Sequence, residues 1–129
     1  MRDIEFRGKI AGAEGFVYGK LLAPLASGNA YIAYDVNEVG SFAYISRSEK
    51  VDQETVDQYT GLKDKNGKKI FEGDIGWNEH NECYGVVKFE EGKLLYVWEN
   101  IAEDLWEVAD CIEICGNIHE NPEILEGTE

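Results

Sequence analysis

Apolar residues along the chain occur in short runs separated by Gly, Asn and Asp, and few stretches have the period of an amphipathic helix. Such runs are typical of β-strands. The pattern predicts extended segments at residues 4–10, 16–22, 31–34 and 42–45, with a connection around Pro24 and Gly28. Asp52 stands where an N-cap would, so one helical turn is expected after it.

A second set of strands is predicted beyond a turn at Asn66 and Gly67. An Asn-Gly pair is a strong hairpin signal, because a type I′ turn needs positive φ at both central residues. Residues 70–75, 84–89 and 94–98 then read as a β-meander. The period of two puts apolar side chains on shared faces that can form half of a small barrel core: Val87 and Phe89 on one strand, and Leu94, Tyr96 and Trp98 on the next.

The end of the chain is expected to hold one more strand and a tail. Trp106, Val108, Ile112 and Ile114 alternate if a turn or bulge is placed at Asp110, which predicts a strand over residues 105–118. Asn121-Pro122 should end regular structure and leave residues 123–129 as a loose acidic tail.

These elements together predict a mainly β, β-rich α+β fold. We expect an N-terminal β-rich region over residues 1–60, packed with an SH3-like small barrel over residues 61–120, and an acidic tail over residues 121–129. A chain of 129 residues that is 43% apolar and 12% aromatic is sufficient for a real core.

The net charge of the chain limits the kinds of partner that it can bind. Twelve Lys and Arg against 26 Asp and Glu give a net charge of −14, which repels nucleic acid and anionic membranes at long range. From Glu99 to the end there are ten acids and no Lys or Arg. We therefore expect no membrane partner, and no nucleic acid unless the binding is specific.

The three cysteines predict reduced thiols rather than disulfides. Their number is odd, and the N-terminus lacks the apolar stretch of a signal peptide, so we expect a cytoplasmic protein. Acidic neighbours, namely Glu82, Asp110 and Glu113, would raise the pKa of these thiols and disfavour a cysteine nucleophile. We expect no catalytic residue and no cofactor.

A metal site is the weaker interpretation of the same residues. Five side chains are the candidate ligands: His80, Cys83, Cys111, Cys115 and His119. Residues four apart on a strand lie about 13 Å from each other and cannot share one ion, so ordinary thiols are favoured over zinc.

A basic cluster surrounds the predicted turn and is the one candidate binding loop. Its residues are Lys63, Lys65, Asn66, Gly67, Lys68 and Lys69. Lysines around a turn can contact phosphates, with Tyr59 or Phe71 stacking on a base. The alternative is a solubilising loop tip in an acidic protein, and the sequence contains no phosphate-binding glycine loop.

One stretch resembles a known signature. It covers residues 55–75, with the sequence TVDQYTGLKDKNGKKIFEGDI, and it resembles the signature of the YopX family, whose members are encoded mainly by phages and prophages. The opening MRDIEFR and the closing GNIHENPE are similar to the family's usual ends, whereas Gln53 stands where members commonly have Pro. The resemblance implies a β-rich protein in a bacterial host cell and carries over no catalytic residue. Gly61, Gly67 and Gly73 are interpreted as folding residues.

The leading functional hypothesis is a phage or prophage accessory protein that binds a host or phage protein, without catalysis and as a homo-oligomer. An acidic DNA mimic is a sharper variant of it. The alternatives are a small barrel that binds a specific nucleic acid through the lysine turn, and a metal-dependent enzyme or zinc-structured domain.

Overall fold

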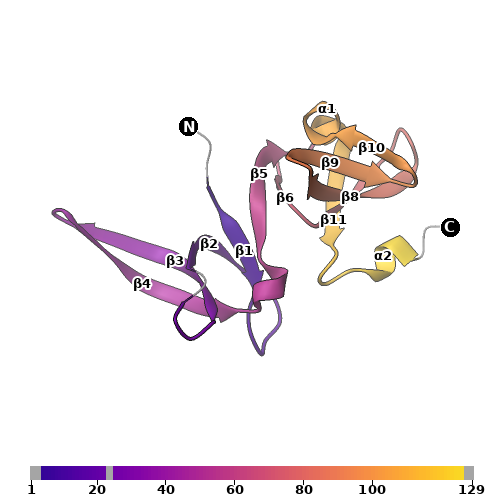
Figure 1. Cartoon of the computed structure of the whole chain (residues 1–129). Coiled ribbons are helices and arrows are strands. Elements are labelled where there is room, and N and C mark those ends of the chain that lie inside the picture. The colour runs from indigo at the N-terminus through magenta and orange to yellow at the C-terminus, as the bar shows by residue number, and fades with distance from the viewer. Residues whose placement is uncertain (1–3, 23–24, 127–129) are drawn as a thin grey trace. The chain divides into compact units, whose positions relative to one another are not determined.

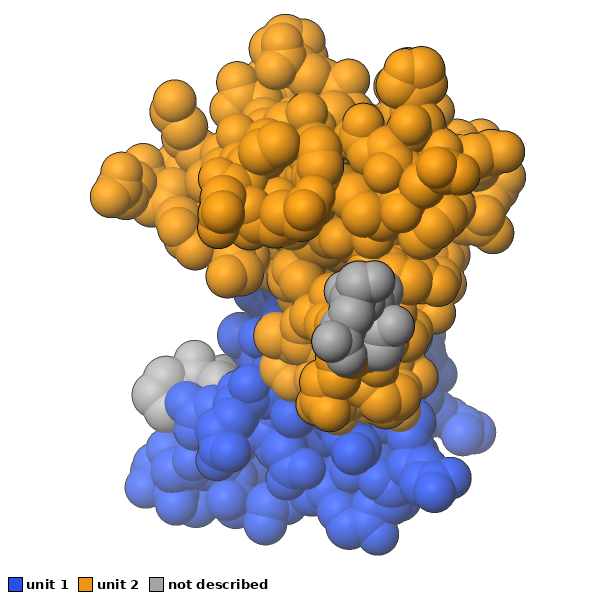
Figure 2. All heavy atoms as spheres, turned by 90° about the vertical axis from the view of Figure 1, so that its right-hand side faces the viewer, with its two compact units in different colours: residues 1–58 blue, residues 59–129 orange. Residues whose placement is uncertain are grey.

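The computed structural model describes residues 4–22 and 25–126, and strands dominate it (Figure 1). Strands contain 59% of the residues and helices 12%, which confirms the mainly β fold class. The chain divides into two compact units, residues 1–58 and 59–129 (Figure 2). The expectations for Met1 to Asp3, Pro24 and residues 127–129 lie outside the described residues.

The first sheet is antiparallel and has six strands in the order β4-β3-β2-β1-β5-β6; unit 1 contains β1 to β4 and the first two residues of β5. All the extended segments expected from the sequence are present, and two of them are longer than expected. The elements are β1 (Phe6–Lys9), β2 (Phe16–Leu22), β3 (Ala30–Val39), β4 (Phe42–Val51), the 3₁₀ turn η1 (Gln53–Thr55) and β5 (Asp57–Lys63). The turn after Asp52 is therefore confirmed, although the Asp52 side chain makes no capping hydrogen bond.

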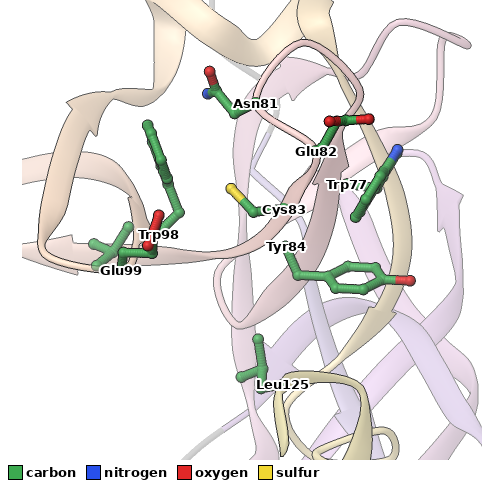
Figure 3. Close-up of a pocket in the computed structure, with 9 residues that line it drawn as sticks. Trp77, Asn81, Glu82, Cys83, Tyr84, Trp98, Glu99 and Leu125 are labelled. Atoms are coloured by element: carbon green, nitrogen blue, oxygen red, sulfur yellow. The ribbon is translucent and has the colours of Figure 1, made fainter. Parts of the chain in front are cut away.

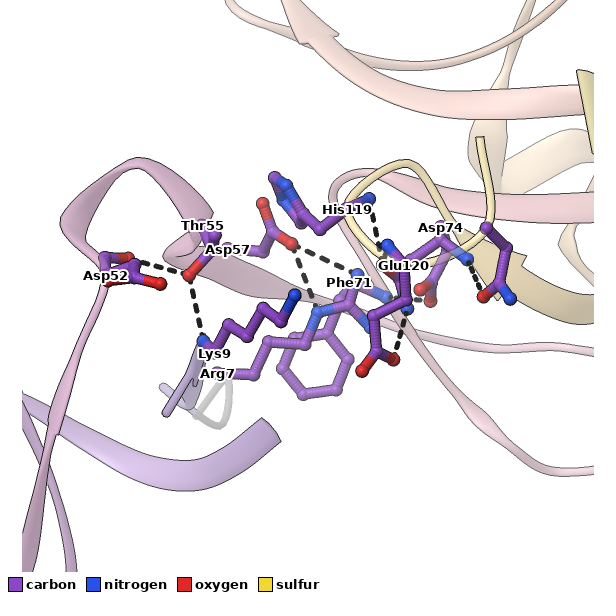
Figure 4. Close-up of polar contacts among 11 residues, drawn as sticks. Arg7, Lys9, Asp52, Thr55, Asp57, Phe71, Asp74, His119 and Glu120 are labelled. Atoms are coloured by element: carbon purple, nitrogen blue, oxygen red, sulfur yellow. Dashed lines mark hydrogen bonds and ion pairs between the residues drawn. The ribbon is translucent and has the colours of Figure 1, made fainter. Parts of the chain in front are cut away.

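Unit 1 contains a small apolar cluster and a buried ion pair. Ala30, Ile32 and Val51 form the cluster. The Arg7 guanidinium donates to Asp57 through Nε and lies 3.1 Å from the same carboxylate oxygen through Nη2 (Figure 4). Both residues are buried, and removing one partner would leave an uncompensated charge.

Unit 2 is built around a five-stranded antiparallel sheet with the order β10-β9-β8-β7-β11. Its elements are β6 (Lys69–Phe71), β7 (Asp74–Asn78), β8 (Cys83–Glu90), β9 (Lys93–Trp98), β10 (Ile101–Asp104), α1 (Leu105–Val108), the 3₁₀ turn η2 (Ala109–Cys111), β11 (Ile112–Asn117) and α2 (Glu123–Glu126). The predicted meander is present as β7, β8 and β9, but its first segment, residues 70–75, is divided between β6 and β7, which belong to different sheets. Because β10 and β11 are the two ends of the order, the sheet is open rather than a closed ring.

The core of unit 2 forms on one face of this sheet. Val87 pairs with Tyr96 and Phe89 with Leu94, and both members of the first pair are fully buried. The expectation that Phe89 belongs to the core is wrong, because its side chain is 57% exposed. Tyr96 donates its hydroxyl proton to the Gly76 carbonyl oxygen at 2.9 Å. A Cβ at Gly85 would lie 2.5 Å from the Tyr96 ring, so the absence of a side chain there leaves room for that ring.

The predicted strand over residues 105–118 is wrong in its first half. Residues 105–111 form α1 and η2, and the strand begins at Ile112. Leu105 and Ala109, four residues apart, are buried, whereas Trp106 is 68% exposed. A spacing of four is the spacing of a helix face, and burial of that face outweighs the alternation of Trp106 and Val108.

The loose tail predicted for residues 123–129 is also wrong where the structure describes it. Residues 123–126 form the single turn α2, in which the Ile124 and Leu125 amides donate to the carbonyl oxygens of Asn121 and Pro122. Pro122 precedes the turn, where its fixed φ favours helix entry.

Candidate binding surfaces

The lysine turn is a structural turn held by a buried acid. Asp64 is 5% exposed; its Oδ1 accepts the amides of Asn66 and Lys68, and its Oδ2 accepts the amide of Ile114 at 2.9 Å. Burial would raise the pKa of Asp64, but these three backbone donors and the charge of Lys68 together lower it below its usual value.

The geometry of this turn differs from the one expected. Five residues separate the paired Lys63 and Lys69, so this is not a two-residue type I′ hairpin. Gly67 has φ 81°, whereas Asn66 is not left-handed. The turn does not adopt the type I′ geometry, because the carboxylate of Asp64 accepts two amides of the loop and stabilises a longer turn.

Two of the lysines already have partners. Lys65 forms an ion pair with Glu79 at 3.7 Å, and the Lys69 ammonium lies 5.3 Å from the centre of the Tyr59 ring. A lysine that contacts phosphate would first have to leave these contacts.

The candidate metal ligands are distributed over several sites. Cys83 lies on β8, and the Cys115 thiol on β11 donates to the carbonyl oxygen of Ile75. His80 and Cys111 share a shallow hollow with Lys65 and Glu79, and the backbone amide of His119 donates to Asn117. Within residues 4–22 and 25–126, no three His, Cys, Asp or Glu residues are grouped so that they can hold a metal ion.

All three cysteines are free thiols, and the pKa of each is raised, which favours the protonated thiol over the thiolate. Burial is the largest cause of the raised pKa of each thiol. The next contributions are the charge of Glu99 for Cys83, the hydrogen bond to Asp110 for Cys111 and the charge of Glu113 for Cys115. The expected effect of Asp110 and Glu113 is thus present, whereas the charges that act on Cys83 are those of Glu99 and Glu103 and not that of Glu82. A thiolate nucleophile is disfavoured at each position.

Unit 2 also contains a groove with a volume of about 610 Å³. We call it the aromatic groove; its lining residues are Trp77, Asn81, Glu82, Cys83, Tyr84, Val97, Trp98, Glu99 and Leu125 (Figure 3). Trp77 pairs with Tyr84 across β7 and β8, and their rings lie 4.8 Å apart at 59°. Cys83 and Trp98 project from the opposite face, so the groove extends over the end of the β8–β9 pair.

A second surface lies on unit 1, where β3 and β4 extend past the rest of the sheet. Pairing between β2 and β3 stops at Ala33, yet β3 and β4 remain paired up to Val39 and Phe42. We call residues 34–45 the hairpin arm (Figure 1). Its large apolar side chains are all between 43% and 77% exposed: Tyr34, Val36, Val39, Phe42, Tyr44 and Ile45.

Comparison with known proteins places this architecture in a family. A family model described as YopX protein matches residues 5–126. The chain belongs to the YopX family. The resemblance of residues 55–75 to the YopX signature is therefore confirmed across nearly the whole chain.

The YopX fold is also represented among solved structures. The chain is similar to the crystal structure of protein EF1440 from Enterococcus faecalis, with 25% identity over 97% of this chain and 99% of that one and a TM-score of 0.72. No curated protein matches the chain. None of the helices in residues 4–22 and 25–126 has the length and hydrophobicity that a membrane crossing requires.

The signature glycines of this YopX protein have left-handed backbones, with φ between 81° and 88° at Gly61, Gly67 and Gly73. This conformation accords with the folding role expected for them. Neither the aromatic groove nor the arm is evident from the sequence pattern. Predicting the Trp77–Tyr84 pair would require the register of β7 and β8. Predicting the arm would require the length of β3, and the polar residues Asp35, Asn37 and Glu38 conceal the continuation of that strand.

Proposed function

We propose that this YopX protein is a phage or prophage accessory protein that binds other proteins without catalysis, and that it does so as an oligomer assembled through the hairpin arm. The observation that carries the proposal is the arm itself, a two-stranded ribbon with exposed apolar residues on both faces. Val36 pairs with Ile45 on one face, and Val39 pairs with Phe42 on the other.

The stability of such a ribbon supports a binding role. A two-stranded hairpin with no third strand and no covering layer is marginally stable in water. From residue 34 onward, the described strands give β3 a single pairing neighbour, β4. Contact with another protein would provide the missing layer.

The occupant we assign to the arm is a second copy of the chain. The six residues together expose several hundred Å² of surface, a large share of the ~800 Å² that each partner contributes to a standard interface. In addition, β4 is at the end of the strand order. Its last residues, Lys50 and Val51, bond to residues 10 and 11, whereas over the hairpin arm β3 is its pairing partner among the described strands, which leaves the outer edge of that segment open to a further strand.

Charge also favours a second copy at this place. Residues 30–51 contain three acids and two bases, a balance of −1, so the remaining residues carry −13 of the total of −14. Two copies repel each other least where their surfaces are nearly neutral.

Sedimentation velocity tests the proposal. The wild type is expected to sediment as a dimer or larger species at micromolar concentration, and F42T/Y44T as a monomer, because threonine keeps the strand propensity and removes the aromatic surface. The matched control is F89T/I101T, which changes two exposed apolar residues of unit 2 and should leave the assembly intact. A monomeric wild type, or equal effects of the two double variants, would reject assembly through the arm.

A further inference from the structure

The aromatic groove combines aromatic walls with negative charge. Trp77 and Tyr84 supply aromatic surface on one face of the sheet end and Trp98 on the other, and the carboxylates of Glu82 and Glu99 belong to the turns at the same end of the strands. None of the residues that line it is Lys or Arg. Aromatic faces and carboxylates both attract cations, so the lining favours a positively charged ligand with a flat or apolar body.

Two buried polar atoms beside the groove have no partner among the described residues. They are the indole Nε1 of Trp98 and the Oε2 of Glu103. Trp98 pairs with Ile101 and Glu103 with Tyr96, so the two side chains project from the same face of neighbouring strands. An unpaired carboxylate oxygen in a low-dielectric position strengthens the negative potential nearby.

The thiol in the groove wall reports this negative potential. Burial raises the pKa of Cys83, and the charges of Glu99 and then Glu103 raise it further. Both carboxylates therefore act on the groove wall.

Backbone strain is also present at this end of the strands. Glu82 and Glu99 both have φ 51°, a left-handed conformation that Gly or Asn would adopt more easily. Strained positions of this kind are found more often at functional sites than elsewhere.

We propose that the aromatic groove binds an arginine side chain in a segment of a partner protein. The planar guanidinium stacks on aromatic rings and donates to carboxylates in a fixed fork, which the compact and strongly hydrated lysine ammonium does not do. The proposal does not depend on assembly through the hairpin arm.

Nuclear magnetic resonance on the ¹⁵N-labelled full chain tests this assignment. The probes are N-acetylarginine methylamide, the citrulline analogue with the same shape and no charge, the lysine analogue, and a five-residue peptide with a central arginine. The three tryptophans provide an internal comparison, because Trp77 and Trp98 line the groove and the exposed Trp106 does not. The arginine probe should shift the indole signal of at least one of the two groove tryptophans, Trp77 and Trp98, and leave Trp106 unchanged.

The four probes test separately whether binding requires a positive charge, whether it requires the planar guanidinium, and whether the arginine belongs to a peptide segment. The citrulline analogue should give no shift at the concentrations used, the lysine analogue should bind several-fold more weakly, and the peptide should bind more tightly than the single residue. Equal binding of citrulline would reject a cation site, and lysine binding as tightly as arginine would reject a guanidinium site. A peptide no tighter than the methylamide would reject a protein segment as the source.

Two variants with the same chemical change separate the site from the general acidity of the chain. E99Q should weaken arginine binding about fivefold, the effect of one partly exposed charge pair. E91Q is the matched control, because Glu91 also has a left-handed backbone, with φ 50°, but lies outside the groove lining. Equal weakening in both variants, or shifts spread over all three indoles, would show nonspecific attraction and overturn the proposal.

Discussion

Asp64 shows how one side chain determines the shape of a loop. Its carboxylate accepts the amides of Asn66, Lys68 and Ile114, while its own amide donates to the carbonyl oxygen of Lys68 at 2.8 Å. The loop carries the lysines that the sequence suggested as a binding surface. Their positions are a consequence of the hydrogen bonds of Asp64.

We expect D64N to lower the free energy of unfolding by roughly 1–3 kcal/mol at pH 7, because an amide is a weaker acceptor for buried donors. The folded-state pKa of Asp64 lies below its unfolded value, so its stabilisation is complete above the unfolded pKa and is lost as the pH falls through the folded pKa. Urea unfolding between pH 7 and pH 3 measures both effects.

The variant should therefore show a flatter dependence of stability on pH than the wild type. D52N serves as the control, since Asp52 is exposed and its side chain makes no capping hydrogen bond. If D64N and D52N have the same slope, Asp64 does not stabilise the turn through its charge.

The elements show which features the sequence could predict. The first four extended segments and the meander β7 to β9 are visible in the sequence, because each strand alternates over several residues or is bounded by Gly, Asn or Asp. Residues 105–111 were misassigned because Trp106 and Val108 imitate a strand over a short window. The deciding contacts, burial of Leu105 and Ala109, belong to the tertiary structure.

The binding surfaces were less predictable for the same reason. Trp77 and Tyr84 are seven residues apart in the sequence and become neighbours through strand register, and Glu99 reaches the same end of the sheet from another turn. The length of the arm likewise depends on the pairing of β3 with β4. The charged turn around Lys65, by contrast, was conspicuous in the sequence and is structural.

The helical assignment of residues 105–108 gives a prediction for two adjacent residues. L105A should lower the free energy of unfolding by about 2–5 kcal/mol, because it removes a fully buried side chain from the core of unit 2. W106A should change it by less than about 0.5 kcal/mol, because that ring is 68% exposed. Chemical denaturation followed by circular dichroism measures both, and a larger loss for W106A would contradict the assignment.

At the scale of the whole molecule, the net charge of −14 opposes association through the hairpin arm. The arm is apolar and nearly neutral, so screening should reduce the repulsion between copies without weakening the contact itself. We expect the dissociation constant of the assembly to fall as sodium chloride rises from 50 to 500 mM.

Sedimentation equilibrium at several salt concentrations measures this dependence. The variant R47E/K50E makes β4 more acidic. Its assembly should dissociate more readily than that of the wild type at low salt and should form again at high salt. An assembly that loosens as salt is added would mean that ion pairs hold the copies together, and the arm would not be the main contact.

The bond between Asp64 and Ile114 spans fifty positions of the chain. During synthesis the nascent turn at residues 64–68 emerges long before its last hydrogen-bond donor, so the lysine turn cannot be completed until β11 has left the ribosome. A polypeptide cut short before residue 112 would retain a carboxylate that lacks this donor. The second unit therefore matures late and as a whole, and its premature termination products should be substrates for proteases rather than stable fragments.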